Sequence, residues 1–175
     1  MTANEERKRS TRDSANEGRS SGRPIAADYR GAVLAILFAA AASIVAGAVW
    51  YAVLGTATIQ ARGPESTATA AATPPLAALL AEFVRSLVIA SVIARFIVLL
   101  DVVDRLSAVR LGIWLWVGFP AMLLLGSVLW EGVPWLLATI HAGDWLVKLL
   151  LMTFILGAWR RRVAAAKAPD RRDAR

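Results

Sequence analysis

Residues 31–55 have the sequence GAVLAILFAAAASIVAGAVWYAVLG, and none of these 25 side chains is charged. An α-helix rises about 1.5 Å per residue, so about 20 apolar residues cross the roughly 30 Å hydrocarbon core of a bilayer. Three more apolar runs of sufficient length occupy residues 76–100, 111–130 and 134–159. The sequence therefore predicts an all-α fold, an integral membrane bundle of four helices at about these positions.

The composition leaves no room for a separate soluble domain. Of 175 residues, 57% are hydrophobic, and they are concentrated in the four runs. The chain has no cysteine and a single histidine, which excludes disulfides, thiolate metal sites and imidazole-rich centres. We therefore expect neither a metal nor a cofactor. Abundant alanine and a preference for arginine over lysine are typical of bacteria with GC-rich genomes.

Polar tails flank the predicted transmembrane domain, which spans residues 31–159. Residues 1–30 mix seven basic with five acidic side chains and contain almost no large apolar group. Such a segment cannot bury enough surface to offset its ordering entropy, so it is predicted to be disordered. Residues 160–175 form a second, basic tail, in which three arginines directly follow the last apolar run. These arginines are predicted to anchor the helix end at the lipid headgroups.

The distribution of basic residues predicts the orientation. With four spans, both tails and the 101–110 connection share one side of the membrane and carry 16 basic residues. The other side carries only Arg62. Because basic residues favour the cytoplasmic side, we expect a multi-pass protein of the cell membrane with both termini in the cytoplasm. We therefore attribute the net charge of +7 to the basic residues that determine membrane orientation, and we expect no nucleic-acid partner.

The connections differ in character. Residues 56–75 are rich in Ala, Thr, Gly and Pro and are predicted to form a flexible external loop. Residues 131–133 are short enough to make the third and fourth helices antiparallel neighbours. Pro120 lies inside the third run, where a missing N–H interrupts the backbone hydrogen bonds and predicts a kink.

Tryptophans mark the expected ends of the spans, because their amphipathic rings prefer the membrane interfaces. Trp50, Trp130 and Trp135 are predicted near the outer side, and Trp114, Trp116 and Trp159 near the inner side. Trp145 falls deeper and is predicted to be a packing residue.

A stripe of small side chains recurs every four residues along the first helix. It consists of Ala35, Ala39, Ser43 and Gly47. Small residues allow helix backbones to approach closely in a membrane. The stripe is predicted to pack within this chain, and a seam between identical subunits is the alternative.

The remaining candidate feature is a set of polar side chains at membrane depth. Its members are Glu82, Arg85, His141, Asp144 and Lys148. Glu82 and Arg85 are three residues apart on one helix face, and the other three fall within about 60° of one another on the fourth helix. The two groups reach overlapping depths, about 9–14 Å and 10–21 Å from the outer helix starts, and their charges cancel if the histidine is neutral. We therefore expect a buried polar cluster between helices two and four.

Energetics favours pairing in this cluster. A charge at mid-membrane costs about 2.5–3.5 kcal/mol on insertion scales, so these side chains are expected to avoid lipid. A structural ion-pair network is the first interpretation, and a polar pocket or a proton or ion path is the second. Catalysis is not expected, because one histidine and Asp144 lack a nucleophile or metal partner.

Several segments resemble a known family of small bacterial membrane proteins, the domain-of-unknown-function family 1761. They are LWVGF at 115–119, LWEGVPW at 129–135, AGDWLV at 142–147, LGAW at 156–159, GAVWY at 47–51 and FVRSL at 83–87. The resemblance covers about residues 31–159 and implies a multi-pass fold of about four helices, without an established activity. Asp144 stands where the family usually has an uncharged residue, and the first loop lacks the family's usual tryptophan.

Two functions follow as hypotheses. The sequence favours a scaffold or accessory protein that binds another membrane protein or a second copy of itself. The alternative is a component of an ion or small-solute transport pathway that uses the polar cluster. An enzymatic role is not expected, and the expected partners are the lipid bilayer and either a second copy of this chain or a larger membrane protein.

Overall fold

The computed structural model describes residues 23–72 and 75–167, with side chains described for residues 29–61 and 76–166. Its elements are helices, with no strand in these ranges: α2 (Arg23–Ala72), α3 (Pro75–Leu99), α4 (Arg105–Trp116), η1 (Val117–Ala121), α5 (Met122–Glu131) and α6 (Trp135–Lys167). The chain divides into two compact units, residues 1–34 and 35–175. All the contacts described below lie within the second unit.

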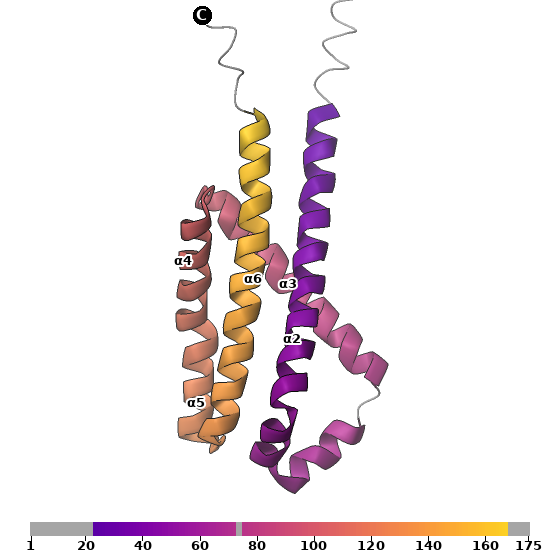
Figure 1. The fold of residues 1–175 in the computed structure, drawn as a ribbon, viewed down its shortest axis with the longest axis vertical. Coiled ribbons are helices and arrows are strands. Elements are labelled where there is room, and N and C mark those ends of the chain that lie inside the picture. Colours follow the sequence, from indigo (N-terminus) through magenta and orange to yellow (C-terminus); the bar gives the residue numbers. More distant parts are fainter. Residues whose placement is uncertain (1–22, 73–74, 168–175) are drawn as a thin grey trace, which may run out of the picture. The chain divides into compact units, whose positions relative to one another are not determined.

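Four helical stretches are long and apolar enough to cross a membrane, which confirms the predicted all-α membrane fold. They are Tyr29–Ala61, Leu76–Leu99, Arg105–Glu131 and Trp135–Ala166. α4, η1 and α5 follow one another as a single span, which lies side by side with α6 (Figure 1). Most of the large apolar side chains on these helices are exposed in the isolated chain, as expected for surfaces that face lipid.

The prediction of a loop with little structure at 56–75 is wrong over most of its length. α2 continues to Ala72, and its C-terminal part turns away from the axis of the preceding turns (Figure 1). Alanine, the best helix former, recurs through this segment and outweighs its glycine and proline. Parts of the predicted tails, 23–30 and 160–167, are also helical. The predicted disorder at 1–22 and 168–175 lies outside the described residues.

The third span begins six residues earlier than predicted, at Arg105. Asp104 is its N-cap, and the Asp104 carboxylate accepts a hydrogen bond of 2.8 Å from the backbone N–H of Ser107. Hydrogen bonds from the Ser107 side chain and backbone lower the pKa of Asp104. Arg105 and Arg110, assigned to a connection from the sequence, therefore lie in the first two turns of α4.

The predicted irregularity at Pro120 is present as a π-helical segment, η1. Proline has no N–H to donate, and a widened turn accommodates the missing i→i−4 bond. α5 then ends at Glu131, and its C-cap is Gly132, whose φ of 72° is left-handed and favours glycine. This cap turns the chain into α6 within a few residues.

α4 and α6 pack closely because small residues face each other along their contact. A Cβ atom at Gly157 would lie 2.9 Å from the Ala108 Cβ, and one at Gly112 would lie 2.8 Å from the Thr153 Oγ1. At the same level, Ile97 of α3 and Leu156 of α6 are fully buried in the core. Close packing of small side chains is a main source of helix association in membranes.

Two tryptophans form interhelical hydrogen bonds that the sequence did not predict. The Trp50 indole N–H donates to the Ile140 carbonyl at 3.1 Å, and the Trp116 N–H donates to the Ala142 carbonyl at 2.8 Å. Both rings therefore tie neighbouring helices to α6. Trp145 packs against the core, as the sequence predicted.

The 100–104 connection is tied to α6 by charge. Arg160, predicted as a headgroup anchor, forms an ion pair with Asp101 between α3 and α4, with 3.1 Å between Nη2 and Oδ1. The start of the predicted C-terminal tail and the 100–104 connection thus lie at the same end of the helices.

Gly157→Ala should destabilise the fold because the new methyl meets Ala108. Overpacking of this kind typically costs about 1–3 kcal/mol. The measurement is the thermal unfolding midpoint of the purified protein in detergent. Gly126→Ala is the matched control, since its methyl would meet only the Trp130 ring at 3.5 Å. Equal midpoints for both variants would show that α4 and α6 are not in close contact.

Candidate functional site

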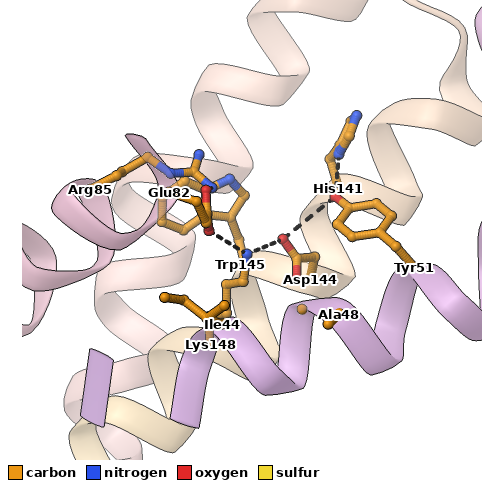
Figure 2. Close-up of a pocket in the computed structure, with 10 residues that line it drawn as sticks. Ile44, Ala48, Tyr51, Glu82, Arg85, His141, Asp144, Trp145 and Lys148 are labelled. Atoms are coloured by element: carbon orange, nitrogen blue, oxygen red, sulfur yellow. Dashed lines mark hydrogen bonds and ion pairs between the residues drawn. The ribbon is translucent and has the colours of Figure 1, made fainter. Parts of the chain in front are cut away.

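All five polar residues predicted from the sequence meet between α2, α3 and α6. Glu82 and Arg85 extend from α3 toward the face of α6 that carries His141, Asp144 and Lys148 (Figure 2). α2 closes the third side of the group. Three helices, α2, α3 and α6, therefore surround the group, whereas the sequence indicated only two.

Lys148 is the centre of the group. Its Nζ lies 3.0 Å from Glu82 Oε1 and 2.9 Å from Asp144 Oδ2, so one ammonium holds two carboxylates. The Lys148 and Asp144 side chains are only 8% and 6% exposed. Asp144 lies one helical turn before Lys148, so the geometry of α6 places these two side chains next to each other. The second carboxylate, that of Glu82, comes from α3. The pairing reduces the cost of charges within the membrane.

Gly47 of α2 provides the space for the lysine. A Cβ atom there would lie 2.7 Å from Lys148 Cε, 2.8 Å from its Nζ and 3.2 Å from Asp144 Oδ1. Ala39, Ser43 and Gly47 are all buried, and Ala35 is partly buried. Most of the small-residue stripe is therefore buried within this chain, as expected for packing against its own helices.

Tyr51 is a member of the site that sequence reasoning missed. Its hydroxyl oxygen lies 2.6 Å from His141 Nδ1 and donates at 3.5 Å to Asp144 Oδ2. The sequence placed Tyr51 with Trp50 at the outer interface. The sequence feature that could have identified Tyr51 is its position four residues after Gly47, which places it on the same face of α2 as the small-residue stripe.

Arg85 forms the exposed end of the site. Its guanidinium pairs with Glu82, and its Cζ lies 5.0 Å from the centroid of the Trp145 ring, a cation–π arrangement. The Arg85 side chain is 48% exposed and that of Glu82 is 28% exposed. A continuous series of contacts thus runs from His141 through Tyr51, Asp144, Lys148 and Glu82 to Arg85.

The charged side chains line a pocket of about 440 Å³. Ile44, Gly47 and Ala48 form its α2 wall, and Trp145 forms part of the opposite side (Figure 2). Pockets of about 300–1,000 Å³ are typical of small-molecule sites. The lining offers exchangeable protons, two carboxylates and two cations, which suits the binding of a polar or charged molecule.

Comparison with known proteins gives one match. The family model described as "Protein of unknown function (DUF1761)" matches residues 34–157, which contain every residue of this site. Neither the curated proteins nor the solved structures gave a match.

Removing Lys148 should be the most damaging single change in the site, because it leaves the Asp144 and Glu82 carboxylates without their shared cation. Loss of one partner of a buried pair typically costs about 3–5 kcal/mol. We expect Lys148→Met to lower the unfolding midpoint more than Asp144→Asn. In the Asp144→Asn variant, Lys148 still has its ion pair with Glu82.

The double variant with Lys148→Met and Asp144→Asn should be more stable than Lys148→Met alone, because it also removes the Asp144 charge that the first substitution leaves unpaired. Unfolding of all four proteins in detergent gives the coupling energy. Arg95→Met is the matched control, since Arg95 is exposed on α3. Strictly additive effects of the two substitutions would contradict the pairing.

Proposed function

This chain belongs to the DUF1761 family, and we propose that it binds a small polar or charged solute from the outer side of the membrane as a component of a transport pathway. The observation that carries the proposal is the open pocket around a buried ion pair. Four helices seldom enclose a selective pathway alone, so the protein acts as an oligomer or with another membrane protein.

Charge at membrane depth supports a binding role. Ionisable side chains within membrane spans are expensive, and they commonly mark substrate or ion pathways. A purely structural network needs no open space beside it. Here the network borders a pocket, and its last two members, Glu82 and Arg85, are partly exposed.

The arrangement of the charges also suits exchange with a ligand. Lys148 is shared by two carboxylates, so a ligand cation could replace it at Glu82 while Asp144 keeps it paired. A ligand anion could likewise pair with Arg85. The site can therefore take a charged group without leaving a buried charge unpaired.

A scaffold role, which the sequence alone favoured, is the second candidate. The surfaces expected for this role were the small-residue stripe and the Trp-rich surfaces. The chain's own helices cover the stripe, whereas Trp114, Trp130 and Trp135 are exposed. What favours this candidate is the complete pairing of the charged side chains, which is what a structural network requires. Water access to the pocket separates the two candidates.

We place the protein in the cell membrane with both termini in the cytoplasm. The 16-to-one distribution of basic residues supports this orientation. A reporter active only in the cytoplasm should be active when fused at Arg175 and inactive when inserted in the 56–75 segment. Activity of a periplasm-only reporter at Arg175 would reverse the assigned orientation.

Cysteine labelling tests the pocket without background, because the chain has no native cysteine. Ala48 lines the pocket, whereas Val49 is 58% exposed and lies outside the pocket lining. The two positions differ in depth by about 1.5 Å. A membrane-impermeant thiol reagent added from the outer side should label Ala48→Cys and leave Val49→Cys unlabelled.

The two candidates give opposite results in this assay. Labelling of Ala48→Cys alone means that water enters the pocket, as solute binding requires. If neither cysteine reacts in intact membranes but both react after unfolding, the site is sealed, and the scaffold role replaces the transport role.

A further inference from the structure

The face of α3 that carries Glu82 and Arg85 continues deeper into the membrane as an apolar surface. Beyond the charged site lies a second pocket, of about 490 Å³. It is lined by Val88, Ile89, Val92 and Phe96 of α3, with Phe119 of η1 and Leu123 of α5. At 100° per residue, the α3 residues of both pockets fall within an arc of about 140°. One helix face is thus polar toward its outer end and apolar beyond it.

Trp145 joins the two pockets, since its side chain lines both of them. The Arg85 guanidinium lies over its ring, and Ile89 follows Arg85 by one helical turn. A molecule that reaches along α3 past Trp145 would therefore pass directly from charged to apolar surroundings.

Both pockets are accessible from the side of the helices. The Arg85 side chain is 48% exposed, and Val88 and Val92 are 57% and 48% exposed. In a bilayer the exposed edge of this face, at Arg85, Val88 and Val92, would border lipid, so an amphiphile could enter laterally there. Its polar end would meet Arg85 and Glu82 while its chain followed the apolar pocket.

We propose that the ligand of the site is a phospholipid with a zwitterionic head that carries a primary ammonium, such as phosphatidylethanolamine. This inference rests on the binding role of the proposed function and goes beyond it, because the polar group that the site takes is then the head of a lipid instead of a free solute. The charged pocket holds two carboxylates and two cations, which cancel. A head without net charge keeps that balance, whereas an anionic head adds an uncompensated charge at membrane depth.

The donors and acceptors of the exposed end match the two parts of such a head. A guanidinium has five N–H donors, and Arg85 uses Nη2 for Glu82, which leaves donors for a phosphate. Glu82 accepts one bond on each oxygen, and a carboxylate has about four acceptor positions, so it can also take an ammonium N–H. The charged pocket lies closer to the outer end of α3 than the apolar one, which matches the direction of a lipid in the outer leaflet.

Lipid binding to the full-length protein, freed of lipid in detergent, tests the proposal by native mass spectrometry. The probes are dioleoyl phosphatidylethanolamine, phosphatidylglycerol, phosphatidylcholine and soluble O-phosphoethanolamine. Phosphatidylethanolamine should bind about tenfold or more tightly than each of the others, because choline has no N–H, glycerol lacks the cation and the soluble head lacks the chain.

Matched variants assign the binding to this face. Arg85→Gln should weaken phosphatidylethanolamine binding about tenfold, and Arg95→Gln on the same helix should not. Val92→Trp should fill the apolar pocket and weaken binding, whereas Val98→Trp, outside that pocket, should not. Thermal unfolding shows whether each variant is folded. The lipid selectivity of the unsubstituted protein is measured without any variant, so it tests the proposal even if a variant does not fold.

The possible failures are distinct. Equal binding of the three lipids, unaffected by Arg85→Gln, would mean a nonspecific lipid annulus and overturn the inference. Binding of soluble phosphoethanolamine as tightly as the lipid would also overturn it, while leaving a polar-solute site. Failure of the proposed function itself appears separately, as an unreactive Ala48→Cys.

Discussion

The structure of the site depends on one constraint, the burial of the Lys148 ammonium among transmembrane helices. A lysine in this position needs anionic partners, and it has two, Asp144 on its own helix and Glu82 on α3. The requirement brings α3 against α6, and the absence of a side chain at Gly47 brings α2 close to the same point. Packing and electrostatics are therefore coupled, because a larger residue on α2 would displace the cation that holds α3.

Much of the fold could be predicted because a membrane span has a strong signal in sequence. Length and apolarity located the four helices, and Pro120 marked the irregular turn inside the third span. The ends were less predictable. Asp104 caps a helix that begins in a charged segment, and alanines carry α2 to Ala72 through residues with loop-like composition. Local capping and propensity determine these ends, and hydropathy does not report them.

The candidate site was predictable where helical periodicity fixes the geometry. Spacing and depth brought together the five charged or polar residues on α3 and α6. The contribution of α2 was not evident, because glycine and tyrosine carry no charge to mark them. Tyr51 bonds with His141 and Asp144, and Trp50 bonds to the backbone of α6. Such aromatic residues near a span end are usually assigned to the interface, and only the neighbouring helix reveals their hydrogen bonds.

The most direct test of the account is the distance from the Lys148 side-chain nitrogen to the carboxyl carbons of Glu82 and Asp144. Solid-state NMR dipolar recoupling between ¹⁵N and ¹³C can measure it in the full-length protein in lipid bilayers. The chain has only three lysines, at positions 8, 148 and 167, so the signal can be assigned by substitution. We predict a charged ammonium within about 4 Å of both carboxyl groups, as in a paired salt bridge. A neutral amine, or a Lys148 nitrogen remote from both carboxyl groups, would contradict the account.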